Sequence, residues 1–371
     1  MRSLFVYDPH DLDAPVPGGV QLCSQEFLGI VRAASDEVEL VPVTITKAPF
    51  WRLRRLLGLG SYLFYRPKDA SSRLAKEVAT VRPTHIFLNR SELMRIAPLA
   101  AKLAPEAKIV IMSHGNQSGD DLYEVAGPGG RRKSLLDRMA ATWQLGLDLI
   151  TESSYRHRYL DAICVMSEEE ETLERWLGAT TTVVLPRVIH SRPLDWQPIM
   201  GRVGFVGTLN HTPNRVALER LCEELVCLNT TDFEFRLVGG PDDIGRALAA
   251  KYSFVQYLGR LDDAALQREA VSWSLFLNPI FWLSRGASMK LGQSLSWAIP
   301  SLSTRAGARG YHLAPGLLFL TEDSADAFAA KLRDLVHDKE SLTAVRSRLL
   351  SSGEDWPDVN SLALRLTSIL G

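Results

Sequence analysis

Residues 203–214 read VGFVGTLNHTPN, and this stretch decides the fold. An apolar run ends at Val206, small residues follow from Gly207, and Pro213 and Asn214 begin a helical pattern. Backbone amides in such a loop can approach an anion closely, because glycine has no side chain to block it. The stretch therefore predicts a strand, a glycine loop and a helix, the repeating unit of a parallel α/β sheet.

The same alternation of short apolar runs and helical patterns continues outward in both directions. Between the two series lies a stretch, 186–198, with three prolines and little periodicity, which we interpret as a linker. We therefore predict two Rossmann-like domains with parallel sheets, spanning 1–190 and 199–354. The predicted strands are 4–7, 38–43, 85–88, 109–112, 162–165 and 183–185 in the first domain, and 203–206, 235–238, 254–258, 275–277, 301–302 and 317–320 in the second.

Length and charge agree with this organisation and narrow the possible partners. A chain of 371 residues is long enough for two domains. The formal net charge of -1 provides no basic field for non-specific binding to nucleic acid, so we expect no nucleic-acid partner. The start, MRSLFVYDPHD, has too short an apolar run for a signal peptide. These features indicate a cytoplasmic protein.

The segment 47–66 interleaves aromatic and leucine side chains with Arg52, Arg54 and Arg55. Such a basic, aromatic-rich insertion can touch an anionic acceptor or lie on the inner face of a membrane as a peripheral contact. A helix packed on the sheet with solvated arginines is the other interpretation. A second basic patch, 131–133, is typical of a solvated loop.

The first domain has two candidate sites at the ends of predicted strands. Gly18, Gly19 and Val20 form a glycine loop before a helix, where backbone can approach a ligand, although a structural turn explains it equally well. The spacing is not that of a dinucleotide fingerprint. His114 follows the strand 109–112, at the edge where open α/β sheets bind ligands, and can hydrogen-bond a sugar hydroxyl. A histidine that only caps a helix is the alternative.

The second domain has a stronger pattern at 285–290, RGASMK, immediately before a helical segment. Two cations, a glycine and a serine at a helix N-terminus suit a diphosphate, because the helix dipole and free amides add to the point charges. A solvated Arg285 and Lys290 pair is the alternative interpretation. We expect the Gly207 and Thr208 loop to contribute further amides.

The run from Gly286 through Lys290, Gln293 and Pro300 to Thr304 resembles the donor-site segment of retaining glycosyltransferases of family 4, which have the GT-B fold. Further short pieces follow in the order of that family along nearly the whole chain. They include Gly18-Gly19-Val20, Ser113-His114-Gly115, Pro186, Gly207, Asn214, Val238-Gly239, Gly259-Arg260, Gly310 and Asp355-Trp356.

This resemblance implies a fold and a reaction. The two Rossmann-like domains would face each other across a cleft, and the segment 355–371 would return as a helix to the first domain. A nucleotide-diphosphate sugar would be the donor substrate, with a glycan, a lipid-linked sugar or another hydroxyl as the acceptor, and with no metal and no cofactor. The predicted enzyme is a glycosyltransferase that acts with retention, with a role in polysaccharide biosynthesis.

The resemblance also implies roles for individual residues. His114, Lys290 and Arg285 are the predicted catalytic residues, and Lys290 would stabilise the departing diphosphate. The acceptor would lie against the loop of Gly18, Gly19 and Val20. The predicted donor-binding residues are Gly207, Thr208, Arg260, Gly286, Ala287, Ser288, Met289 and Gln293, with Arg260 near the base and Gln293 in place of a ribose-binding glutamate.

The chain departs from the family pattern at its charged positions. Arg285 and Gln293 stand where family members often have two glutamates, and Thr208 and Thr212 stand where a cationic pair is usual. We infer that Arg285 and Lys290 take over phosphate neutralisation. Because arginine binds carboxylates with two hydrogen bonds, Arg285 also suggests a donor sugar that carries a carboxylate.

Three other functions remain open at this point. A nucleotide-sugar epimerase of the same fold would consume the donor alone, without an acceptor. A non-catalytic nucleotide-sugar-binding protein would explain the absence of the two glutamates. A nicotinamide dehydrogenase is disfavoured because the fingerprint is missing.

Overall fold

The computed structural model describes the whole chain except residues 14–17, 58–59, 64, 128–133, 283–284 and 353–355. The patch at 131–133, Phe64 and Asp355 therefore lie outside the described residues. The chain divides into two compact units. Unit 1 comprises Met1–Arg187, Arg285–Ala287 and Pro357–Gly371, and unit 2 comprises Val188–Ser284 and Ser288–Trp356.

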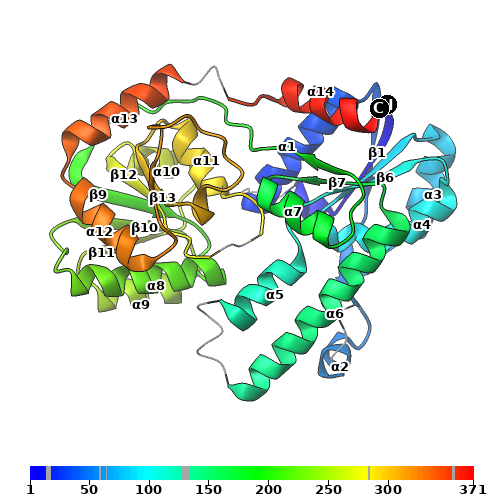
Figure 1. Cartoon of the computed structure of the whole chain (residues 1–371), viewed down its shortest axis with the longest axis horizontal. Helices are drawn as coiled ribbons and strands as arrows, with labels where there is room; N and C mark the ends of the chain where they lie inside the picture. The colour runs from blue at the N-terminus through cyan, green and yellow to red at the C-terminus, as the bar shows by residue number, and fades with distance from the viewer. Residues whose placement is uncertain (14–17, 58–59, 64, 128–133, 283–284, 353–355) are drawn as a thin grey trace. The chain divides into compact units, whose positions relative to one another are not determined.

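Unit 1 is built on a parallel six-stranded sheet with the order β2-β1-β5-β6-β7-β8 (Figure 1). Its central strand β5 is buried at every position, as expected for a parallel strand covered by helices on both faces. The strands are β1 (Arg2–Tyr7), β2 (Glu37–Pro42), β5 (His85–Asn89), β6 (Lys108–Met112), β7 (Ala162–Val165) and β8 (Thr182–Val184). The helices are α1 (Gly19–Ala34), α3 (Ala70–Val81), α4 (Ala97–Leu103), α5 (Gln117–Ala126), α6 (Leu135–Tyr159), α7 (Glu168–Trp176) and α14 (Val359–Leu370).

The last helix, α14, belongs to unit 1 although it follows the whole of unit 2 in the sequence. It packs against α1, and its Leu366 and Leu370 are buried. The carbonyl oxygen of Leu370 accepts hydrogen bonds from Nζ of Lys108 at 2.7 Å and from Nε2 of His85 at 3.1 Å. The C-terminal segment thus returns to the first unit.

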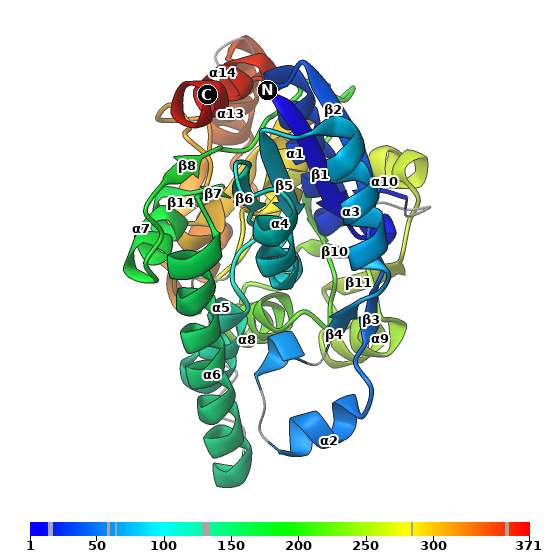
Figure 2. The same ribbon diagram turned by 90° about the vertical axis from the view of Figure 1, so that its right-hand side faces the viewer.

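The segment 47–66 differs from the single packed helix that one interpretation predicted. A two-stranded antiparallel ribbon, β3 (Ile45–Lys47) with β4 (Tyr65–Pro67), encloses the short helix α2 (Trp51–Leu56). The amide of Ile45 donates to Oδ2 of Asp8 at 2.7 Å, which ties the ribbon to the loop after β1. In Figure 2, α2 and the amino-terminal end of α6 project at the same end of unit 1.

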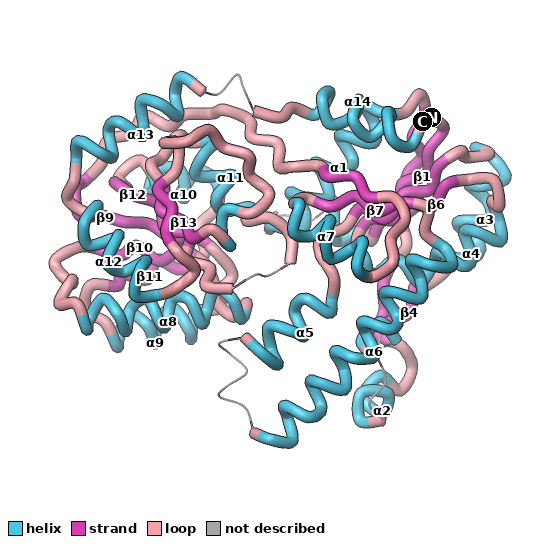
Figure 3. Tube along the Cα trace, in the orientation of Figure 1, coloured by secondary structure: helices cyan, strands magenta, loops and turns pink. Residues whose placement is uncertain are grey.

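Unit 2 repeats the architecture with the strand order β11-β10-β9-β12-β13-β14, again entirely parallel (Figure 3). The strands are β9 (Ile199–Val206), β10 (Glu234–Val238), β11 (Val255–Gly259), β12 (Trp273–Asn278), β13 (Ser301–Thr304) and β14 (Phe319–Thr321). The helices are α8 (Thr212–Cys227), α9 (Asp242–Lys251), α10 (Asp263–Ala270), α11 (Met289–Ser296), α12 (Ala325–Leu335) and α13 (Lys339–Ser351). The prediction of two parallel, Rossmann-like sheets is confirmed.

Among the described residues, no helix combines the length and the apolar character that crossing a bilayer requires.

The contact between β9 and β12 at the centre of unit 2 requires a glycine at position 204. Gly204 lies against the indole ring of Trp273, which is fully buried. A Cβ at position 204 would lie only 2.0 Å from Cδ2 of that ring. The indole cannot easily move, because its Nε1 donates to Oε1 of Glu269 at 3.0 Å.

We therefore predict that Gly204→Ala destabilises the protein by about 1–3 kcal/mol, the usual cost of overpacking a core. Differential scanning calorimetry would measure this as a lower transition temperature. Gly29→Ala is the matched control, since a Cβ there meets no atom within 4 Å and the residue lies inside helix α1. Equal stability of Gly204→Ala and the wild type would contradict the packing described here.

Candidate active site

The strand order of unit 2 reverses direction between β9 and β12. From β9 the chain continues outward through β10 and β11, and then returns to place β12, β13 and β14 on the other side. Ligands of open α/β sheets bind at the carboxyl ends of strands beside such a reversal. The Gly207 loop follows β9, and helix α11 with Lys290 follows β12, so both predicted donor elements lie at this position.

Lys290 is held by two neighbours within unit 2. Its Nζ donates to Oδ1 of Asn214 at 2.6 Å and lies 4.9 Å from the ring centroid of Phe205. Nδ2 of Asn214 donates in turn to the carbonyl oxygen of Thr208 at 2.9 Å, which fixes the amide orientation. Asn214 thus joins helix α8, the loop after β9 and the Lys290 side chain.

A second cation, Arg309, stands close to Lys290. Burial and then the positive charge of Arg309 lower the pKa of Lys290 to about 7. No ion pair joins Lys290 to a carboxylate anywhere in the described part of the chain. An anion entering this site would meet two cations whose mutual repulsion it relieves.

The buried amide of Asn278 joins the two segments from which the cations extend. Its Oδ1 accepts from Oγ of Ser288, the N-cap residue of α11, at 3.0 Å. Its Nδ2 donates to the carbonyl oxygen of Gly307 at 2.9 Å, in the short 3-10 turn Ala306–Ala308. Nη1 of Arg309 donates to the carbonyl oxygen of Ala306, at 2.6 Å, so this turn also orients the guanidinium group.

The backbone at the end of β9 approaches the neighbouring loop closely. A Cβ at Gly239 would lie 1.8 Å from the carbonyl oxygen of Gly207, and Gly239 has a φ of 139°. A Cβ at Gly240 would lie 2.4 Å from Nε of Arg260. The Arg260 side chain therefore packs over this glycine turn, although Arg260 itself is exposed at its position after β11.

The remaining predicted donor residues lie on or beside α11. Met289 and Gln293 are half-buried positions of this helix, and Ser288 caps its start, where its carbonyl oxygen also accepts from the Tyr311 hydroxyl at 2.6 Å. The structure thus brings Gly207, Thr208, Ser288, Met289, Lys290 and Gln293 together at the two loops beside the reversal, with Arg260 on the adjoining loop.

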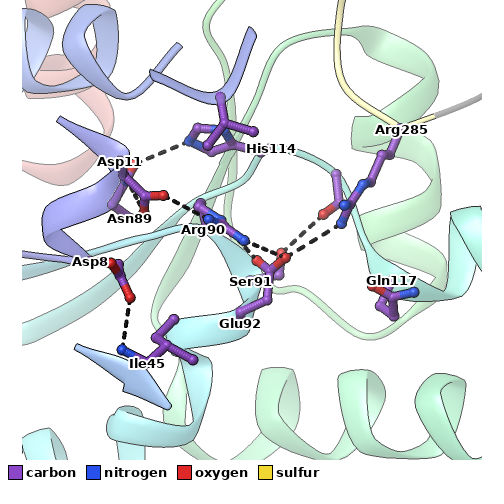
Figure 4. Close-up of polar contacts among 12 residues, drawn as sticks. Asp8, Asp11, Ile45, Asn89, Arg90, Ser91, Glu92, His114, Gln117 and Arg285 are labelled. Carbon is purple, nitrogen blue, oxygen red and sulfur yellow. Dashed lines mark hydrogen bonds and ion pairs between the residues drawn. The ribbon is translucent and has the colours of Figure 1, made fainter. Parts of the chain in front are cut away.

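Arg285, Gly286 and Ala287 group with unit 1, although the sequence prediction assigned them to the second domain. Nε of Arg285 lies 2.9 Å from Oδ2 of Asp120, and its Nη1 lies 3.6 Å from Oε1 of Glu92 (Figure 4). The amide of Gly286 donates to Oε1 of Glu170 at 2.7 Å. Arg285 therefore contacts carboxylates of unit 1, whereas Lys290 contacts side chains of unit 2.

In unit 1 the strand order reverses between β1 and β5, and polar side chains follow both strands. Asp11, after β1, is fully buried and accepts from Nη1 of Arg90 at 2.7 Å. Arg90, after β5, has a φ of 81° and makes two hydrogen bonds to Glu92. Figure 4 shows this chain of alternating charges, which ends on Arg285.

The charged groups of this network shift one another's pKa values. Burial raises the pKa of Asp11, and Arg90 only partly opposes this. Burial alone would also raise the pKa of Glu92, but Arg90 and Arg285 lower it to about 2. Glu92 is therefore ionised at neutral pH.

His114 is connected to the same group through Asn89. Nδ2 of Asn89 donates to Asp11 at 3.2 Å and to Oγ of Ser24 at 2.9 Å, so its Oδ1 is left to accept from Nε2 of His114 at 3.1 Å. The proton of the neutral imidazole must then sit on Nε2, which leaves Nδ1 as a hydrogen-bond acceptor. Burial and then Arg90 lower the pKa of His114 to about 3.

Gly18 is the N-cap of α1, and its amide donates to Oε1 of Gln21 at 2.9 Å. Gly19 begins the helix, and Val20 is exposed on its first turn. Oε1 of Gln21 thus occupies one amide of this loop, and its Nε2 donates to the carbonyl oxygen of His10 at 3.0 Å.

Sequence reasoning missed Asp11, Arg90, Glu92, Asn278 and Arg309 as site residues. A usable signal existed for three of them, since Asn89-Arg90-Ser91-Glu92 follows an apolar strand and Arg309 follows β13. Among the described residues, no group of three or more His, Cys, Asp or Glu side chains is arranged to hold a metal ion.

The sequence of unit 2 decides the class of protein. Residues 201–338 match the family model described as "Glycosyl transferases group 1". The chain is a glycosyltransferase. The matched range contains Gly207, Asn214, Lys290 and Arg309, so the cationic site lies within the recognised part of this glycosyltransferase. No curated protein matches the sequence of the chain significantly.

Solved structures show that the glycosyltransferase has the GT-B fold over its whole length. Sucrose-phosphate synthase from Thermosynechococcus elongatus is similar with a TM-score of 0.68 at 14% identity, covering 99% of this chain and 97% of that one. Anabaena Alr3699/HepE in complex with UDP-glucose is similar with a TM-score of 0.65 at 14% identity, covering 99% and 98%. OtsA is similar with a TM-score of 0.60 at 15% identity, covering 100% and 99%. At these identities the likeness concerns the fold alone.

The state of His114 in the glycosyltransferase is directly measurable. We predict a neutral ring with the proton on Nε2 that does not titrate between pH 5 and pH 8, because its pKa is lowered to about 3. ¹H–¹⁵N NMR of the ring nitrogens would record this, with His114→Gln used to assign the signal. A signal that titrates near pH 6.5 would contradict the buried, Asn89-bound geometry.

Proposed function

We propose that this glycosyltransferase moves a sugar from a nucleotide-diphosphate sugar to a glycan, a lipid-linked sugar or another hydroxyl acceptor, with retention and without a metal. The observation that carries the proposal is the pair of cations, Lys290 and Arg309, at the strand reversal of unit 2. Lys290 has no carboxylate partner among the described residues, as an anion site requires.

In the proposed reaction, the main electrostatic requirement is to stabilise the leaving group. As the bond from the sugar to the diphosphate breaks, negative charge accumulates on the departing phosphate oxygens. Lys290 and Arg309 would neutralise that charge, and the positive ends of the α8 and α11 helix dipoles would add to this stabilisation. Because Asn214 holds Lys290 and the carbonyl oxygen of Ala306 holds Arg309 in advance, little reorganisation is needed during the reaction.

Uridine diphosphate is the first probe to use. HepE from Anabaena, one of the structures that this chain resembles, has been crystallised with UDP and with UDP-glucose. We assign the nucleotide to unit 2, with the base near the loop of Arg260, and Gln293 to the ribose.

We assign the acceptor, or the sugar that is transferred, to the polar edge of unit 1. Nδ1 of His114 would accept a hydrogen bond from a sugar hydroxyl, because its Nε2 is already bound to Asn89. At a pKa of about 3 the ring cannot act as a general acid near neutral pH. The Gly18, Gly19 and Val20 loop and a membrane contact through 47–66 remain predictions for the acceptor side.

Arg285 acquires a narrower role in this proposal. Its ion pairs with Asp120 and Glu92 hold it in unit 1, so a carboxylate on the donor sugar would have to replace one of them. We therefore place phosphate neutralisation on Lys290 and Arg309, and keep Arg285 as a residue that contacts the transferred sugar.

The lowered pKa of Lys290 predicts a pH dependence for UDP binding. At pH 7 about half of the free protein carries the ammonium form, and bound diphosphate would raise the pKa of Lys290 again. We expect UDP affinity to fall by up to about tenfold per pH unit between pH 7 and pH 9, with proton uptake on binding. Isothermal titration calorimetry in buffers of different ionisation enthalpy measures both.

Lys290→Arg is the matched variant for this experiment, because arginine stays charged over the whole range. It should bind UDP with no such pH dependence and without proton uptake. A wild type that takes up no proton, or a Lys290→Met variant with unchanged UDP affinity, would remove Lys290 from the diphosphate site.

Turnover provides an independent check. We expect Lys290→Ala to lower kcat by roughly 100- to 1000-fold, the usual loss for one preorganised donor to a developing charge. His114→Ala should lower turnover with unchanged UDP affinity, because His114 lies in unit 1. Thermal unfolding of each variant controls for folding, and sugar release that needs no acceptor would favour an epimerase or a hydrolase instead.

A further inference from the structure

The contact between α5 and α6 in unit 1 contains two neighbouring carboxyl groups. Asp121 on α5 and Asp148 on α6 lie within hydrogen-bond reach of each other, and Asp148 is fully buried. Within the described residues, no Lys, Arg or His side chain forms an ion pair with either group. Because two ionised carboxylates in such a place repel each other strongly, the pair favours a state in which one of them is neutral.

The hydrogen bonds of the two groups show which oxygen needs a proton. Asp148 accepts three of them, at Oδ1 from the amide of Ser61 at 2.9 Å, and at Oδ2 from the Ser61 hydroxyl group and from Nε2 of Gln144 at 3.0 Å. Oδ1 of Asp121 accepts from Nε2 of Gln117 at 3.3 Å. Oδ2 of Asp121 is buried and meets no donor in the described part of the chain. Since three donors favour ionised Asp148, a proton on Oδ2 of Asp121 completes the network.

The titration of Asp121 agrees with this arrangement. Burial, and then the hydrogen bond to Asp148 and its negative charge, raise the pKa of Asp121 to about 8. The charge of Asp120, the preceding residue on α5, acts in the same direction. Asp121 therefore carries its proton at neutral pH.

Other titratable groups lie on the elements that pack here. They are Asp120 and Glu124 on α5, Glu152 and Arg156 on α6, Tyr62 next to Ser61, and Arg95 of the 3-10 helix η3 (Ser91–Ile96). Nε of Arg156 pairs with Glu174. Nη1 of Arg95 donates to the carbonyl oxygen of Tyr62 at 3.1 Å. Burial raises the pKa of the Tyr62 hydroxyl well above its usual value, so Tyr62 stays neutral.

Asp121 adjoins the residue that pairs with Arg285. Oδ2 of Asp120 lies 2.9 Å from Nε of Arg285. Helix α5 is tied to α6 at its first turn, where the amide of Ser118 donates to Oε1 of Glu152 at 3.1 Å and its hydroxyl group donates to Oε2 at 2.5 Å. The contact of Asp121 is the next tie along α5. Loss of that contact would let α5 turn about Ser118 and carry Asp120 with it.

We propose that Asp121 and Asp148 share one proton at neutral pH, and that this proton positions α5 and thereby the Asp120 partner of Arg285. Asp121 and Asp148 are then positioning residues. When alkaline pH removes the proton, two negative charges meet in a buried contact, and the second turn of α5 separates from α6. Only the last step, from Arg285 to the transferred sugar, rests on the proposed function.

Infrared difference spectroscopy of the full-length protein detects the proton. We expect the carbonyl band of a protonated carboxylic acid at neutral pH and its loss as the pH rises through about 8. Asp121→Asn should lack this titrating band. Asp148→Asn should lack it as well, because Asp121 ionises when its charged neighbour is removed.

Glu152→Gln is the matched control, since it removes a buried carboxyl group from the same helix and should leave the titrating band in place. Circular dichroism verifies the folding of each variant, and the wild-type titration needs no variant. A wild type without the band would overturn the proposal. A band that persists unchanged in Asp148→Asn would do the same, because burial of Asp121 alone would then hold the proton.

The positioning step is measured at Arg285 itself. In ¹H–¹⁵N NMR the Nε–H signal of Arg285, assigned with Arg285→Lys, should shift between pH 7 and pH 9 in the wild type. In Asp121→Asn it should stay at its neutral-pH position, because the amide donates to Asp148 at every pH. An unmoved wild-type signal, or an equal shift in Asp121→Asn, would refute the positioning role. Neither measurement uses a nucleotide sugar, so a failure here is distinct from a failure of UDP to bind.

Discussion

When helices cover both faces of a parallel sheet, polar functional side chains can lie together only at the edge where the strands end. Every strand of both six-stranded sheets runs parallel to its neighbours. In each unit the chain must also reverse its direction of growth once, between β1 and β5 and between β9 and β12. The loops on the two sides of that reversal separate and expose backbone and side chains. All candidate site residues discussed above follow from this constraint.

The two edges differ in how their charges are compensated. In unit 1 each cation has a carboxylate, so Arg90 bridges Asp11 and Glu92 while Arg285 lies between Glu92 and Asp120. In unit 2, Lys290 and Arg309 stand beside each other, and their repulsion contributes to the low pKa of Lys290. A balanced network is suited to hydrogen-bonding neutral hydroxyls, whereas two neighbouring cations that repel each other are suited to a strong anion. This contrast is the physical basis for assigning the diphosphate to unit 2 and sugar hydroxyls to unit 1.

The sequence was sufficient to predict the fold because a parallel strand is a short apolar run with polar residues at its end. All twelve strands of the two main sheets begin and end within a few residues of the predicted ranges, and α14 lies within the predicted segment 355–371. The β3–β4 ribbon was not predicted, since its strands of three residues each carry too little periodicity. The projecting start of α6 was not predicted as a surface, because its apolar residues have the spacing of a buried helix.

A site residue could be predicted from the sequence only where its type and its place in a single loop are enough to identify it. Lys290 and the Gly207 loop were identified from their place after a strand. Arg309 required the tertiary contact made by Asn278. Asp11 with Arg90 required β1 and β5, which are 78 residues or more apart in sequence, to be neighbours. The grouping of Arg285 with unit 1 could not be predicted from the sequence. Arg285 directly precedes the residues of the donor-site motif, and this position in the chain suggests the second domain. Charge pairing across the fold is a three-dimensional property.

Lys290 and Arg309 form the proposed site for the diphosphate of a nucleotide sugar. A crystal structure of the protein soaked with UDP tests it most directly. We expect phosphate oxygens within hydrogen-bond distance of Lys290 Nζ and of the Arg309 guanidinium group, with the phosphates beside the Gly207 loop. Diphosphate density at the Arg90 and Glu92 edge of unit 1, or a cation pair that stays unbound while UDP occupies another site, would contradict it.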